Sequence, residues 1–132
     1  MIFAVSEYSS DDVKEFVQEA LELLDSAEHE LLGAEKSSSK SFYDAVFRAF
    51  HSIKGGAGML GMPELQTHMH KVESLWGNLK GRQNLDRNES EFFLLAIDAA
   101  RKFLKGEVPT FDYLALNVNV NANQASAPQP QS

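Results

Sequence analysis

The chain has 132 residues, of which 43% are hydrophobic and 10% aromatic, enough apolar side chains for one modest core but not for two domains. Nineteen acidic residues against twelve basic ones give a net charge of −7, which disfavours nucleic acid or an anionic membrane surface as a partner. The sequence contains no cysteine, which excludes a disulfide framework and a thiolate zinc site.

The sequence carries no targeting or membrane signal that would place it outside the cytoplasm. No apolar run is long enough to span a bilayer, and the opening MIFAV lacks the length and basic flank of a secretory signal. We therefore expect a cytoplasmic protein without membrane insertion. Residues 1–8 show no clear period and are predicted to be an N-terminal segment outside the fold.

The first predicted helix begins at Ser9 or Ser10, where a hydroxyl followed by acidic residues is typical of an N-cap. Apolar residues then recur at helical spacing as far as about Leu32. They are Val13, Phe16, Val17, Ala20, Leu24, Ala27 and Leu31. Gly33 and the serines at 37–39 end this helix, and so short a connector predicts an antiparallel neighbour.

The second predicted helix runs from about Ser41 to Gly58 or Leu60. Its apolar face contains Phe42, Val46, Ala49, Phe50, Ile53, Ala57 and Leu60. His51 lies on the outward side with Gly55 and Gly58. Glycine costs about 1 kcal/mol against alanine inside a helix, so two beside a histidine need a reason, which access for a docking partner supplies. An exposed neutral imidazole can accept a phosphoryl group, although a lone histidine near a helix end is more often a solvated surface residue.

The third predicted helix begins at Pro63, whose fixed φ and missing N–H suit a first helical position, and ends at Gly81. Its apolar face contains Leu65, Met69, Val72, Trp76 and Leu79. Trp76 is therefore predicted in the core, and His68 at its edge. His70 and Glu73 lie off this face and close together, so they can contact each other and a neighbouring helix.

Asp86 with Glu89 matches a capping box and predicts a fourth helix that extends to Gly106. Its inner face contains Phe93, Ala96, Ile97, Ala100, Phe103 and Leu104. Residues 109–116 can form one further short helix, with Phe111, Tyr113 and Leu114 over the end of the bundle. The pattern thus predicts an all-α fold, an antiparallel four-helix bundle over residues 9–116.

Residues 117–132 alternate asparagine with small residues and end in Pro-Gln-Pro-Gln-Ser, a composition typical of a disordered linker. We expect further domains to follow this tail.

Two other chemistries compete for the same residues. The glycines at 56, 58 and 61 match the spacing of a dinucleotide-binding loop, but that loop follows a strand, and here a helix precedes it. A metal site at His68, His70 and Glu73 is disfavoured because residues two apart on a helix point to different faces. We therefore predict neither a bound cofactor nor a metal in this domain, and we interpret His29 as a solvated residue.

One string of residues and several later positions carry a family resemblance. They are HSIKGGAG at 51–58 and, further on, Gly61, Leu65, His70 and Glu73. This pattern resembles a histidine phosphotransfer (HPt) domain, and within that family it is most similar to the N-terminal phosphoacceptor domain of the chemotaxis histidine kinase CheA. The resemblance covers roughly residues 9–105. The chain departs from the family pattern at Phe50, Lys71, Trp76 and Gly77, which bears on the partner and not on the chemistry.

The resemblance implies a role for each residue of the group. His51 would be phosphorylated, Lys54 would face the phosphoryl oxygens, and Gly55 would leave room for a docking partner. His70 and Glu73 would face His51, with Glu73 accepting the hydrogen bond that fixes its tautomer. ATP and Mg²⁺ would belong to the ATP-binding catalytic domain of a histidine kinase. The phosphoryl group would pass to an aspartate of a CheY-like response regulator.

Two other functions stay open at this point. The chain can be a stand-alone phosphorelay HPt protein, which the linker-like tail disfavours. It can also be a helical interaction module whose exposed histidine has no chemistry. An acid-labile, base-stable label on His51 would separate this last reading from phosphotransfer.

Overall fold

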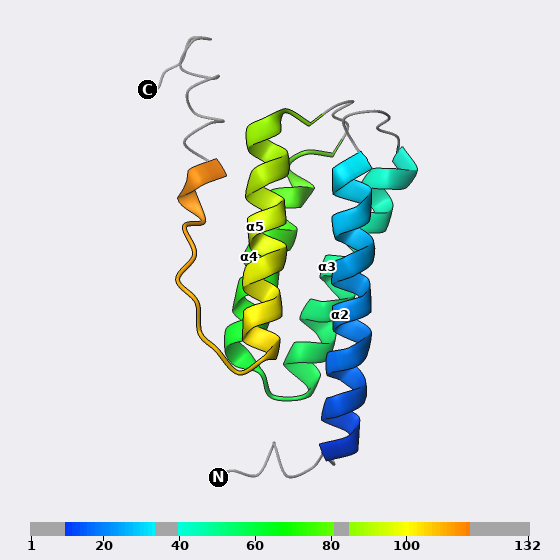
Figure 1. The fold of residues 1–132 in the computed structure, drawn as a ribbon, viewed down its shortest axis with the longest axis vertical. Coiled ribbons are helices and arrows are strands. Elements are labelled where there is room, and N and C mark those ends of the chain that lie inside the picture. Colours follow the sequence, from blue (N-terminus) through cyan, green and yellow to red (C-terminus); the bar gives the residue numbers. More distant parts are fainter. Residues whose placement is uncertain (1–9, 34–39, 81–84, 117–132) are drawn as a thin grey trace.

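The computed structural model describes residues 10–33, 40–80 and 85–116, and its elements are α-helices. They are α2 (Ser10–Gly33), α3 (Lys40–Met59), α4 (Pro63–Gly77) and α5 (Arg87–Leu104). The four helices run alternately up and down (Figure 1), and α3 and α5 each pack against both α2 and α4. The predicted all-α four-helix bundle is confirmed. The segments predicted at 1–8 and 117–132 lie outside the described residues.

The core lies between the four helices and is centred on Phe50, Trp76 and Phe93, whose side chains are fully buried. The Trp76 ring meets the Phe93 ring edge-on, with 4.9 Å between centroids. Burial of each such side chain contributes roughly 1.5–3 kcal/mol, so these three rings are a large part of what holds α3, α4 and α5 together. The prediction that Trp76 belongs to the core is confirmed.

A tight turn at Gly61 sets α4 directly beside α3. Gly61 has a φ of +75°, which a residue without Cβ adopts at little cost. The N–H of Met62 donates to the carbonyl of Ala57 at 2.8 Å, the six-to-one bond of a Schellman motif. Pro63 then begins α4, as its position in the sequence predicts. This turn reverses the chain, so α4 runs back alongside α3.

The ends of α4 and α5 agree only partly with the sequence pattern. The predicted capping box is present, since Glu89 N–H donates to Asp86 Oδ1 at 2.8 Å and Asp86 N–H donates to Glu89 Oε1 at 3.0 Å. α4, however, ends at Gly77, four residues before the predicted stop at Gly81, a position outside the described residues. Leu79 in the following turn is still buried.

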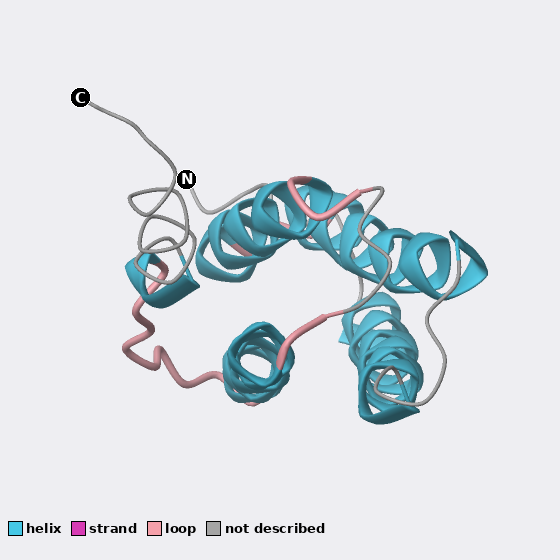
Figure 2. Ribbon diagram, turned by 90° about the horizontal axis from the view of Figure 1, so that it is seen from above, coloured by secondary structure: helices cyan, strands magenta, loops and turns pink. Residues whose placement is uncertain are grey.

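The predicted helix at 109–116 is wrong for its first half. Residues 107–112 are not helical, and the described helical turn covers only 114–116, which Figure 2 shows as a short separate turn at the left of the bundle. Asp112 explains the late start, because its side chain accepts a hydrogen bond from Leu114 N–H at 3.0 Å and so caps a helix that begins after it. Leu114, predicted over the bundle end, is 64% exposed, whereas Leu116 is buried.

Candidate functional site

His51 projects from α3 into solvent, with a side chain that is 62% exposed. Phe50 and Ile53 on the same helix are fully buried, so the register of the apolar face turns His51 outward. Its Nδ1 contacts Oε2 of Glu73, which lies 22 residues away on α4. The imidazole is therefore held at one nitrogen while the ring remains accessible.

Glu73 bridges two basic side chains of α3, those of His51 and Lys54. Its side chain is only 9% exposed, and Lys54 Nζ donates to Oε1 at 2.6 Å while the imidazole of His51 meets Oε2. Burial raises the pKa of the Glu73 carboxyl, but the hydrogen bonds and charges of Lys54 and His51 outweigh burial and lower that pKa overall. Glu73 is thus a carboxylate at neutral pH.

The contact with a carboxylate decides which nitrogen of His51 carries the proton. A carboxylate accepts hydrogen bonds and cannot donate them, so Nδ1 of a neutral imidazole must be the N–H. Nε2 then holds the lone pair. The hydrogen bond described for His51 uses Nδ1, so Nε2 is the atom that can react with an electrophile from solvent.

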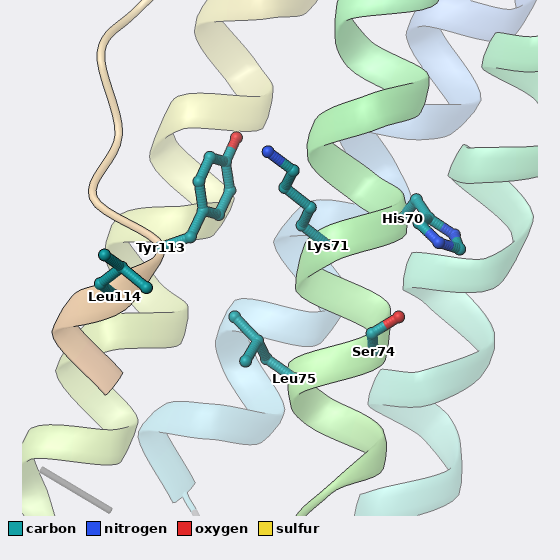
Figure 3. A pocket seen from close by; sticks show the side chains of 6 residues that line it. All are labelled: His70, Lys71, Ser74, Leu75, Tyr113 and Leu114. Atoms are coloured by element: carbon teal, nitrogen blue, oxygen red, sulfur yellow. The ribbon is translucent and has the colours of Figure 1, made fainter. Parts of the chain in front are cut away.

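The other predicted site residues lie on the same two helices, Gly55 and Gly58 on α3 and His70 on α4. Gly55 is exposed, and a Cβ there would meet open space. Gly58 is also exposed, yet a Cβ there would come within 2.5 Å of the Gln66 side chain, so this glycine faces α4. His70 is exposed, and its ring points to the α3 side of α4 (Figure 3). In the described structure the hydrogen bond of His51 is made with Glu73 and not with His70.

A shallow cavity of about 330 Å³ lies along α4 and is lined by His70, Lys71, Ser74, Leu75, Tyr113 and Leu114 (Figure 3). Lys71 projects toward this cavity, and its Nζ lies 4.7 Å from the centroid of the Tyr113 ring. The cavity lies where Tyr113 and Leu114 pack against α4.

His68 is more deeply placed than predicted, being 1% exposed instead of lying at the core edge. Its Nε2 donates to the carbonyl of Ala96 at 2.9 Å, and its Nδ1 therefore accepts from the Tyr113 hydroxyl at 2.6 Å. Burial lowers the pKa of His68, with Lys71 adding to the effect against the hydrogen bond to Ala96. Among the described residues, no group of three His, Cys, Asp or Glu side chains is placed to hold a metal ion.

Two features near His51 escaped the sequence reasoning. A Cβ at Gly56 would lie 2.3 Å from Cε1 of Phe16, so this glycine allows α2 to approach α3 closely. The ring of Phe47 stacks on the imidazole of His51, with centroids 5.9 Å apart and planes at 12°. The spacing of Tyr43, Phe47 and His51, four residues apart on one helix, is the signal that could have revealed this second feature.

The chain is similar to one known protein family and to known chemotaxis proteins. The family model described as Hpt domain matches residues 13–103. The chain is 33% identical to the chemotaxis protein CheA of Salmonella typhimurium over 114 residues, and the alignment covers 80% of this chain and 17% of that protein. It is 30% identical to CheA of Borreliella burgdorferi over 91 residues, covering 67% of this chain and 10% of the relative. The chain thus spans less than a fifth of the length of these relatives. No helix in the described ranges has the length and apolarity to cross a bilayer.

Proposed function

This chain belongs to the Hpt domain family, the histidine phosphotransfer domains of two-component signalling, and from that premise we propose that His51 is its phosphoacceptor. The observation that carries the proposal is the pairing of an exposed imidazole with a buried carboxylate, His51 Nδ1 with Glu73 Oε2. This pairing leaves Nε2 of His51 as the nucleophile.

The proposed reaction is an in-line phosphoryl transfer from ATP. The lone pair of Nε2 attacks the γ-phosphorus, the bond between that phosphorus and the β,γ-bridging oxygen breaks, and ADP leaves with the electron pair. The imidazole becomes positively charged as the new P–N bond forms. Its proton stays on Nδ1 in the hydrogen bond to Glu73, whose negative charge balances the imidazolium, and can later pass to solvent.

Lys54 has a second part in this proposal. Its ammonium group has three donors, of which one is used by Glu73 Oε1. Lys54 lies one helical turn from His51, so its ammonium group can donate a remaining N–H to an oxygen of the phosphoryl group carried by Nε2 and neutralise its charge. His70, exposed on the α3 side of α4, would contribute to the surroundings of the phosphoryl group without accepting it.

We propose partners that supply what the described site lacks. Phosphoryl transfer from ATP requires nucleotide and Mg²⁺, which the ATP-binding catalytic domain of a CheA-like histidine kinase would hold. An aspartate of a CheY-like response regulator would then take the phosphoryl group, docking over the open surface at Gly55. Both phosphoryl transfers would take place in the cytoplasm.

The experiment is phosphorylation of this chain by a CheA-type catalytic domain with radiolabelled ATP and Mg²⁺. Wild type should acquire an acid-labile, base-stable label. His51→Gln should fold normally, because the residue is exposed, and should acquire none. His70→Gln is the matched control and should still be labelled. If His51→Gln still acquired label, the acceptor would be another histidine. An unlabelled wild type would favour the interaction module without chemistry.

A further inference from the structure

The imidazole of His51 is the outermost ring of a column of four aromatic rings. Trp76 of α4 stacks on Tyr43 of α3, with centroids 5.4 Å apart and planes at 12°. Tyr43 stacks on Phe47 at 6.3 Å and 15°, and Phe47 stacks on His51 at 5.9 Å and 12°. Near-parallel planes at these separations are the offset arrangement that aromatic pairs prefer. The column runs from the centre of the core to the exposed acceptor.

The inner end of this column is rigid. Trp76 is fully buried, and its indole N–H donates to the backbone carbonyl of Tyr43 at 3.1 Å. Three rings also meet it edge-on, so it has no space in which to turn. They are Phe42, Phe50 and Phe93. A ring that lies flat on Trp76 is therefore fixed in orientation, and it passes that constraint to the next ring.

The outer end of the column meets the reacting residue. A histidine that is 62% exposed can rotate about χ2, and such a rotation would take Nδ1 away from Glu73. Phe47 opposes this rotation because its ring lies offset against the imidazole in a nearly parallel plane. The Phe47 face is also the negative side of its quadrupole, which attracts the positive charge that develops on the imidazole when Nε2 is phosphorylated.

We propose that Phe47 and Tyr43 are positioning residues for phosphorylation, holding the His51 ring so that Nδ1 stays on Glu73 and Nε2 faces solvent. This inference rests on the proposed function for its kinetic consequence, but the orientation of the ring can be tested without it. Phe47 acts directly on the imidazole, and Tyr43 acts through Phe47. The fixed base of the column is Trp76.

The first test is the tautomer of His51, measured by ¹⁵N NMR on the free chain. Wild type should show a predominant Nδ1–H tautomer at neutral pH. Phe47→Leu removes the ring but keeps a large apolar side chain, and it should raise the Nε2–H fraction, with Tyr43→Leu having a smaller effect in the same direction. Phe103→Leu removes another half-buried ring, one that packs against His68, and should leave the His51 signals unchanged.

The second test is the rate of labelling by phosphoramidate, a small phosphodonor that needs no kinase. Here Nε2 attacks phosphorus, the P–N bond of the donor breaks, and ammonia leaves. Phe47→Leu should slow labelling of His51 about two- to twelvefold, the range that corresponds to the 0.5–1.5 kcal/mol of an aromatic pair. Phe47→Tyr restores a ring and should react within about twofold of wild type.

The outcomes separate this inference from the function on which it rests. A changed tautomer with slower phosphoramidate labelling in Phe47→Leu, restored in Phe47→Tyr, supports the positioning role. Unchanged tautomer signals in a folded Phe47→Leu variant would overturn it, even if the kinase reaction slowed, because Phe47 would then act by contacting the kinase. Should Phe47→Leu not fold, Tyr43→Leu gives the same decision. If phosphoramidate labelled the wild type but the kinase did not, the proposed function would be contradicted and the positioning role would remain intact.

Discussion

Replacing Glu73 by alanine tests the core of the proposed chemistry in one step. The carboxylate accepts hydrogen bonds from both His51 and Lys54, and each would lose its partner. Without Glu73 the imidazole is free to carry its proton on either nitrogen and to turn about χ2. It also loses the negative charge that balances the imidazolium formed with the P–N bond.

The size of the kinetic effect follows from the type of hydrogen bond. A hydrogen bond to a charged group contributes about 1.5–3 kcal/mol, which corresponds to a rate loss of about 10- to 150-fold if it is realised in the transition state. Stability should suffer much less. Removal of one partner from a fully buried pair costs roughly 3–5 kcal/mol, but the side chains of Lys54 and His51 are 23% and 62% exposed and can turn to water. We expect a loss of about 1 kcal/mol.

The assay is the initial rate of phosphorylation by a CheA-type catalytic domain under saturating ATP, with urea unfolding of the same samples. Glu73→Ala should lower the rate within the stated range and leave His51 as the labelled residue. His70→Ala, also on α4, should have a milder effect. Glu64→Ala, an exposed glutamate of the same helix, controls for loss of charge. A folded Glu73→Ala variant within about twofold of wild type would refute the orienting role.

Three other changes test the surface, the packing and the buried histidine. Gly55→Leu should slow phosphoryl transfer to a response regulator. Gly33→Leu is the control, because that position is equally open but lies at the end of α2, and it should not slow transfer. Equal transfer rates for the two variants would contradict a docking surface at Gly55. Gly55→Ala should raise the free energy of unfolding by about 0.5–1 kcal/mol. Gly56→Ala should not raise it, because Phe16 must move to make room for the new Cβ. Equal increases in the free energy of unfolding, measured with urea, would contradict this packing. Burial lowers the pKa of His68 below the unfolded value of about 6.5, so the unfolded chain binds more protons and stability should fall as pH drops below that value. Urea unfolding between about pH 7.5 and 5 should show a steeper decline for wild type than for His68→Leu, and equal slopes would exclude this linkage.

The sequence by itself determined the helices and the outward position of His51. Apolar spacing, the Asp86 cap and Pro63 are local signals, and a helix register depends on nothing more distant than a few turns. They therefore predicted which face of α3 enters the core and hence that His51 does not. The same local reasoning placed the start of the last helical turn too early, since the capping bond of Asp112 competes with helix formation before it.

Tertiary structure decided what His51 contacts. The pairing with Glu73 joins residues 22 apart, and whether Glu73 or His70 reaches the imidazole depends on the rotation of α4 against α3. That rotation is set by interdigitating side chains at the interface, above all Trp76 against Tyr43, and not by the pattern within either helix. His68 was misplaced for the same reason: its burial depends on Tyr113, contributed by a segment 45 residues away, and a helical period carries no information about such a neighbour.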